Sequence, residues 1–93
     1  MKHQRHFDTR EVAQRDTALI WKMVGELDRS VELLNVDISA EEARVRIFDR
    51  SDAAYPILAR SFAARRANLM GTIAVLKERL PRLDQAELLA EVA

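Results

Sequence analysis

The strongest constraint on the fold is a stretch in the second half of the chain, residues 55–83, in which large apolar residues recur at steps of three and four. This spacing places side chains on one face of an α-helix. The stripe has one gap, at Arg65, where it would otherwise continue. We therefore predict a long amphipathic helix that must bury its stripe, whose members are Leu58, Phe62, Leu69, Ile73, Leu76, Leu80 and Leu83.

A second stripe of the same kind runs from Arg10 to about Asn35 and predicts a second long helix. Asp16 interrupts this stripe, while Trp21 and Val24 lie beside it and widen the apolar face. A helix of about 25 residues is about 38 Å long, which is more than a compact domain of this size presents. The two helices are therefore expected to cover each other as a hairpin. The apolar positions of this second stripe are Val12, Leu19, Ile20, Met23, Leu27, Val31 and Leu34.

The segment between the long helices is predicted to form a short helix over residues 40–50. Ser39 followed by Glu42 has the spacing of a capping box, in which the two side chains satisfy backbone amides at a helix start. A strand is the alternative for these residues, but an isolated strand has nothing to pair with. Residues 51–56 then form a connector, because Pro56 fits only the first turn of the helix that follows.

The fold class that these segments define is all-α: a single domain over residues 1–93, built as a helical hairpin with short connecting and C-terminal helices. Pro81 is expected to end or bend the second long helix, so that residues 84–93 form a short C-terminal helix that frays. Residues 1–8 are expected to be a flexible N-terminus. The chain has no cysteine, and so no disulfide supports its small core. Because apolar residues such as Val75 stay uncovered in a hairpin, we expect two hairpins to form a dimeric four-helix bundle.

Acidic and basic residues balance at 15 each, but they are unevenly distributed along the chain. Residues 23–49 carry seven acids and three bases, whereas residues 50–82 carry seven bases and two acids. Opposite charges in two helical blocks suit helices that pack on each other, within one chain or between two chains. The alternative is that both blocks are solvated helix faces.

Two charged residues, Asp16 and Arg65, occupy positions within the apolar stripes. A charge in such a position is costly unless it is paired, and a paired one can fix helix register or partner number. We therefore hypothesise that Arg65 pairs with an acid of the first helix: Glu26, Asp16 or Asp28. The alternative is that Arg65 extends its head group out to solvent.

The sequence lacks the residue patterns typical of catalytic, cofactor or metal sites. Gly25 and Gly71 each stand alone within a helical stretch, so there is no phosphate-binding loop. His3 and His6 precede the periodic region without a third ligand nearby, which argues against a metal site. No serine lies in a nucleophile motif, and there is no thiol. We therefore predict no enzyme activity, no cofactor and no metal.

In length and all-α character the chain resembles the small helical dimers of the chorismate mutase type. The resemblance implies that arginines and a lysine inside a bundle hold a dicarboxylate, and Lys22, Arg29, Arg60 and Arg65 would supply those charges. The sequence does not show the residue spacing of that family. A small bundle enzyme is therefore the third hypothesis for function.

A nucleic-acid-binding regulator is the second hypothesis, and it rests on the basic face of residues 50–82. The arginines there are scattered along a helix with acids nearby, which argues against nucleic acid as a partner. Few lysines and aromatics flank the apolar stripes, which argues against a membrane surface. No apolar run approaches the roughly 20 residues of a membrane span, and the start of the chain lacks a secretory signal, so we expect a cytoplasmic protein.

The function most compatible with these features is a non-enzymatic protein–protein interaction module, such as an adaptor, regulator or assembly factor, that acts as a homodimer. Its expected partner is a second copy of itself, with another protein as a further candidate. Asn68 is a poor helix former beside two arginines, and we expect it to hydrogen-bond across an interface. The residues predicted to form the interface are Trp21, Val24, Leu58, Phe62, Arg65, Asn68, Leu69, Ile73, Leu76 and Leu80.

Overall fold

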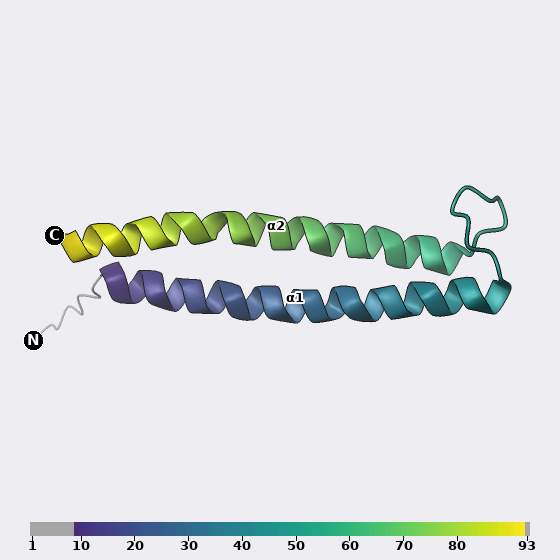
Figure 1. The fold of residues 1–93 in the computed structure, drawn as a ribbon, viewed down its shortest axis with the longest axis horizontal. Coiled ribbons are helices and arrows are strands. Elements are labelled where there is room, and N and C mark those ends of the chain that lie inside the picture. Colours follow the sequence, from purple (N-terminus) through teal and green to yellow (C-terminus); the bar gives the residue numbers. More distant parts are fainter. Residues whose placement is uncertain (1–8, 93) are drawn as a thin grey trace, which may run out of the picture.

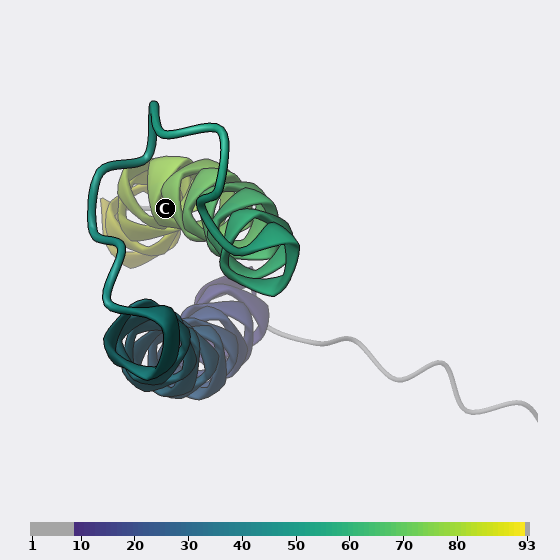
Figure 2. The same cartoon turned by 90° about the vertical axis from the view of Figure 1, so that its right-hand side faces the viewer.

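The structure, a computed structural model that describes residues 9–92, consists of two long helices joined by a loop (Figure 1). Helix α1 spans Thr9–Val45 and helix α2 spans Ile57–Val92, and the two lie side by side and antiparallel. The view along the helices shows a single layer (Figure 2). The hairpin measures 67 × 29 × 15 Å, and its Cα radius of gyration of 20.6 Å exceeds the roughly 12 Å of a compact chain of this length. The predicted helical hairpin is confirmed.

The two helices pack along one stripe on each, which we call the seam. Its residues alternate steps of three and four, which is the heptad spacing of a coiled coil. In the middle of the seam, Ile20 and Val24 of α1 form a cluster with Ile73 and Leu76 of α2, and none of the four is more than 8% exposed. The seam comprises Ala13, Thr17, Ile20, Val24, Leu27, Val31, Leu34 and Ile38 of α1, and Ala59, Phe62, Arg66, Leu69, Ile73, Leu76, Leu80 and Leu83 of α2.

The seam of α1 is rotated relative to the stripe predicted from the sequence. Val24, which was placed beside the stripe, is 3% exposed and lies in the core, whereas Leu19 and Met23, which were placed within it, are 54% and 39% exposed. Asp16 is exposed, and the neighbouring Thr17 takes the seam position. The prediction was wrong here because α1 carries two adjacent apolar stripes, whose large residues together look like one stripe of intermediate direction.

Helix α1 extends beyond its predicted end at Asn35 and reaches Val45. The separate short helix predicted over residues 40–50 is therefore wrong, because its first half belongs to α1 and its second half to the loop. Ser39 lies inside α1 and does not cap a helix start. The extension of α1 is explained by Ile38, which is 4% exposed and belongs to a second cluster with residues at the start of α2. Helix α1 must continue past Ile38 for this side chain to be buried there.

Helix α1 ends in a Schellman motif at the start of the loop, residues 46–56. Arg46 has a φ of 60°, the left-handed conformation that glycine usually adopts at this position. The backbone N–H of Ile47 donates to the carbonyl of Glu42 at 3.3 Å and so pairs one of the carbonyl groups that have no partner within the helix at its C-terminal end. Ile47 also packs against the cluster that contains Ile38. The chain therefore leaves α1 in a fixed direction.

Tyr55, in the loop, contacts both helices. Its ring is 3% exposed and belongs to the same cluster as Ile38 and Ala59. Its hydroxyl donates a hydrogen bond to Oε2 of Glu42 at 2.7 Å, and the guanidinium of Arg60 lies 5.2 Å from the centroid of its ring. Because these contacts join α1, the loop and α2, they determine where the chain turns back.

Helix α2 continues without a break through Pro81, so of the two predicted effects of this proline, ending or bending the helix, ending is wrong. A separate C-terminal helix is not confirmed, because residues 84–92 continue α2. Proline removes one helical hydrogen bond, but Leu80 and Leu83 pack against the seam cluster on either side of it and hold both parts of α2 on α1. The N-terminus predicted to be flexible, residues 1–8, lies outside the described residues.

Replacing Arg46 with glycine is expected to raise the free energy of unfolding by about 0.5–1 kcal/mol, because glycine adopts a positive φ without a steric penalty. Urea denaturation followed by circular dichroism measures the change. The matched control is Ala43→Gly inside α1, which should lower the free energy of unfolding by up to about 1 kcal/mol. A loss of stability in Arg46→Gly would contradict the Schellman motif.

The pKa of Tyr55 is expected above its ordinary value of 10.0, because its hydroxyl donates to Glu42 and because burial and the Glu42 charge disfavour the phenolate. The protonated Tyr55 hydroxyl adds to the free energy of unfolding below pH about 10, and this contribution is lost as the pH rises through the raised pKa. Tyr55 is the only tyrosine in the sequence, so a tyrosinate absorbance titration measures its pKa directly. Glu42→Ala should return the pKa towards 10.0. Glu41→Ala, which removes a carboxylate bound to Arg44 instead, should leave it raised.

Candidate functional site

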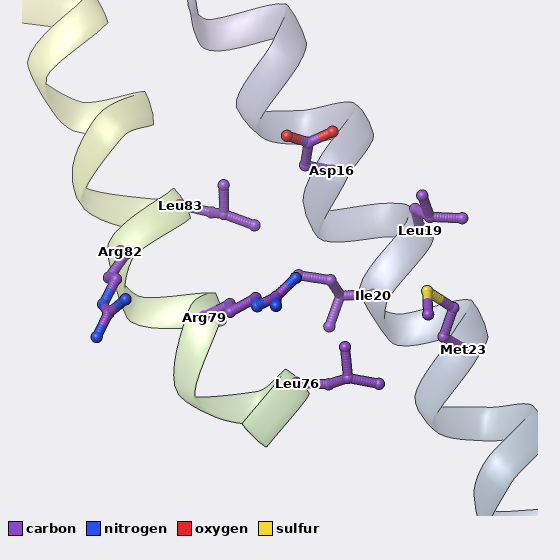
Figure 3. Close-up of a pocket in the computed structure, with 8 residues that line it drawn as sticks. All are labelled: Asp16, Leu19, Ile20, Met23, Leu76, Arg79, Arg82 and Leu83. Atoms are coloured by element: carbon purple, nitrogen blue, oxygen red, sulfur yellow. The ribbon is translucent and has the colours of Figure 1, made fainter. Parts of the chain in front are cut away.

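A groove of about 470 Å³ lies between α1 and α2 in the half of the hairpin near the chain termini (Figure 3). Seam residues, among them Ile20 and Leu76, form part of its lining. Exposed apolar residues of α1, Leu19 and Met23, border it on one side. The complete lining is Asp16, Leu19, Ile20, Met23, Leu76, Arg79, Arg82 and Leu83.

The charged residues of the groove have opposite signs on the two helices. Helix α1 supplies Asp16 and helix α2 supplies Arg79 and Arg82, and all three are exposed. Arg79 reaches across the groove towards Ile20, whereas Arg82 points away from α1 (Figure 3). Within residues 9–92, Asp16 forms no ion pair with either arginine. The groove therefore offers both an acid and two bases to a bound partner.

The groove belongs to a larger apolar surface, which we call the open face. Residues seven apart in a coiled coil point in the same direction, so the groove residues define a face that continues along both helices. Seven of the exposed large apolar residues in the described part of the chain lie on it, with exposed fractions from 38% to 67%. They are Val12, Leu19, Met23 and Leu33 of α1, and Leu58, Val75 and Leu89 of α2.

The opposite face of the hairpin is less apolar. Within the described residues it carries three exposed large apolar side chains, Trp21, Met70 and Leu88. Its hollow is smaller, about 330 Å³, and has Asp28 and Lys77 among the residues that line it. The open face is therefore the stronger candidate for a binding surface.

Six of the ten residues predicted to form an interface lie in the seam, between the two helices of the same chain. Three of these are buried and three are half-buried. A sequence stripe does not distinguish contact within a chain from contact between chains, so a role for these residues between molecules stays a prediction. The six are Val24, Phe62, Leu69, Ile73, Leu76 and Leu80.

The other four predicted interface residues are exposed. Leu58, Arg65 and Asn68 lie on the open face, at seven-residue steps from groove or open-face residues of α2. Trp21 is 54% exposed and lies on the opposite face. The structure thus brings Leu58, Arg65 and Asn68 onto the surface that contains the groove and separates Trp21 from them.

The basic residue in the seam of α2 is Arg66, and the prediction that Arg65 occupies the seam was wrong. Arg66 is half-buried, and its Nη1 donates a hydrogen bond to Oδ1 of Asn35 on α1 at 2.7 Å. Arg65 is exposed and forms no ion pair with an acid of α1 within residues 9–92. The heptad would have identified Arg66, which lies seven residues after Ala59 and seven before Ile73, but the small Ala59 was not recognised as a seam residue.

The described residues bear on three further expectations: a metal site, a membrane span and a set of basic residues inside a bundle. No group of three or more described histidine, cysteine, aspartate or glutamate residues is placed to hold a metal ion, and His3 and His6 lie outside the described range. Neither helix, as far as it is described, is long and apolar enough to cross a bilayer. The basic residues that the family resemblance would place inside a bundle are exposed on this hairpin, and they are Lys22, Arg29, Arg60 and Arg65.

Comparisons of the chain with protein-family models, with curated proteins and with solved structures give no match. Function is therefore inferred from the seam, the groove and the open face. Of the groove residues, Arg79 and Arg82 were recognised in the sequence only as scattered arginines, because nothing in the sequence placed them opposite Asp16.

A double-mutant cycle on Asn35→Ala and Arg66→Ala is expected to give a coupling free energy of about 1.5 kcal/mol, the lower end of the range for a hydrogen bond to a charged group, because this one is only half-buried. Equilibrium urea denaturation of the four proteins measures it. The control is the same cycle with Arg65→Ala, which should show no coupling because the exposed Arg65 does not contact Asn35. Equal coupling in the two cycles would contradict the placement of Arg66 in the seam.

Proposed function

We propose that this protein is a non-enzymatic protein–protein interaction module that acts as a homodimer, in the role of an adaptor, regulator or assembly factor. The observation that carries the proposal is that the hairpin buries the seam but leaves a second apolar surface, the open face, uncovered. Monomeric proteins in water rarely expose a large contiguous apolar surface unless it binds something.

The seam alone gives the helices limited protection from water. Among the described residues no large side chain is fully buried, and even the cluster around Ile20 and Val24 retains exposed fractions of 3% to 8%. Without a disulfide to restrict the unfolded chain, this thin hairpin has little else to offset the loss of conformational entropy on folding. A second layer of helices over the open face would enlarge the core.

Two hairpins stacked in this way would form a four-helix bundle. Each helix would then contact its own partner helix along the seam and a helix of the second copy along the open face. The opposite face, with Trp21 and Met70, would remain on the outside of the bundle. These exposed apolar residues are where a different protein would bind the assembled dimer.

Light scattering over a wide range of protein concentration, at low and at high salt, tests the homodimer. The expected mass is about twice the chain mass of 10.6 kDa. It should persist at high salt, because salt screens charges but does not weaken apolar contacts. A mass of 10.6 kDa at every concentration would contradict the homodimer. Dissociation at high salt would contradict a mainly apolar interface.

A further inference from the structure

We propose that the open face is the dimer interface and that it binds a second copy of the chain about a twofold axis parallel to the helices. Helix α1 of each copy then packs on helix α2 of the other. This inference rests on the proposed function, which requires a homodimer but specifies neither the face nor the orientation. The occupant is a second copy because the open face is complementary to itself in charge.

The charges of the open face are segregated by helix. On this face, between residues 12 and 40, the charged residues of α1 are all acidic, and the bases of α1 in that range fall on its outer side. The next position in the same series is Arg44, which is basic but is paired with Glu41 of its own helix. The charged residues that α2 contributes to the same face are all arginines. All six charged side chains are exposed: Asp16, Glu26 and Asp37 of α1, and Arg65, Arg79 and Arg82 of α2.

This segregation distinguishes the two ways in which two open faces can stack. A twofold axis across the helices would lay α1 on α1 and α2 on α2, so that acids face acids and arginines face arginines. An axis parallel to the helices lays α1 on α2 on both sides of the interface, so that the acidic side of α1 faces the basic side of α2. Like charges opposed across an interface disfavour association, and opposite charges fix its orientation. The parallel axis is therefore the one that the sequence supports.

The same axis determines which residues meet. Rotation about an axis parallel to the helices does not shift the second copy along that axis. A residue of α1 therefore lies opposite the part of the second copy's α2 that stands at the same height as its neighbours on its own α2. Asp16 and Arg82 line the same groove and therefore stand at nearly the same height along the helix axis. In the dimer, Asp16 of one copy faces Arg82 of the second copy. The antiparallel register likewise places Met23 opposite Val75 of the second copy, which buries both apolar side chains.

Asn68 gains a partner in this arrangement. The register places it opposite Ser30 of the second copy, where the amide can donate to the serine hydroxyl oxygen. The Ser30 hydroxyl hydrogen is already used within its own chain, because Oγ donates to the carbonyl of Glu26 at 3.3 Å. The oxygen therefore remains available as an acceptor. The second copy thus offers a partner for this polar residue of the open face.

The open face is large enough for a stable dimer. Helix α2 has 36 residues, which extend about 54 Å at the rise of an α-helix. Two helices, each about 10 Å wide, present about 1,000 Å² per copy over that length. Stable interfaces bury about 800 Å² per partner. The opposite face has a similar extent, but among the described residues it carries three exposed large apolar side chains against seven on the open face.

Charge reversal in separate chains tests the orientation. Asp16→Arg and Arg82→Asp should each weaken the homodimer by about tenfold or more, because each places like charges opposite one another twice. An equimolar mixture of the two variants should dimerise with a dissociation constant within about threefold of the unsubstituted protein. Within each variant chain the two charges keep the same sign, so recovery on mixing can come only from contacts between chains. Sedimentation equilibrium measures the constants, and circular dichroism checks that each variant stays helical.

A matched pair of substitutions on α1 tests the face. Leu19 and Trp21 are both 54% exposed, but Leu19 lies on the open face and Trp21 on the opposite face. Leu19→Lys should weaken dimerisation about tenfold or more, whereas Trp21→Lys should leave it unchanged. Equal effects, or a larger effect of Trp21→Lys, would overturn the assignment of the open face.

Cross-linking gives an independent readout of the register. The chain has no cysteine, so Met23→Cys and Val75→Cys can be introduced into separate chains without competing thiols. Oxidation of the mixture should give a disulfide-linked heterodimer as the main product. A dimeric protein in which neither the charge variants nor the cysteine variants favour the mixed pair would overturn this inference and leave the homodimer intact. A monomeric unsubstituted protein would overturn both.

Discussion

The whole structure depends on how much apolar surface a long helix can bury against a single neighbour. Helices α1 and α2 meet along the seam, and the heptad spacing keeps that contact continuous over most of their length. Domains are normally built from two packed layers, and this hairpin supplies one. The groove and the open face both follow from the same constraint, because a seam covers only one side of each helix.

The polar residues of the seam reduce its stability but help to fix its register. The hydroxyl oxygen of Thr17 is buried and has no hydrogen-bond partner among the described residues, which is an energetic cost. Arg66 reaches Asn35, and a slip of one helix past the other would separate this pair. At the loop, Tyr55 enforces the same register through Glu42 on α1. Two contacts about two helical turns apart on α1, both in the half of the hairpin next to the loop, therefore select one alignment of helices whose apolar residues alone would tolerate several.

Apolar periodicity was sufficient to predict two long helices and their association as a hairpin, but it could not place the seam. Ala59 is fully buried, at 0% exposed, while its larger neighbour Leu58 is 49% exposed, and hydrophobicity alone ranks them the other way. Only the geometry of close packing favours the small residue there. The extension of α1 was missed for a related reason. Ile38 is buried by Tyr55, which lies across the loop, so no local signal near residue 38 marks the helix as continuing.

The second apolar stripe of α1 explains why the sequence misplaced the seam, and it is also the basis of the proposed dimer. Val12, Leu19 and Met23 satisfy helical periodicity as well as the seam residues do, although the seam does not bury them. A helix in an isolated hairpin needs one apolar stripe, whereas a helix in a four-helix bundle needs two on adjacent sides, since it has two neighbours. In the proposed dimer, apolar residues would pack equally well on either helix of the second copy, so they would supply affinity without orientation. The acids beside the second stripe of α1 and the arginines beside that of α2 would supply the orientation, because the stacking of α1 on α2 is the one that brings opposite charges together.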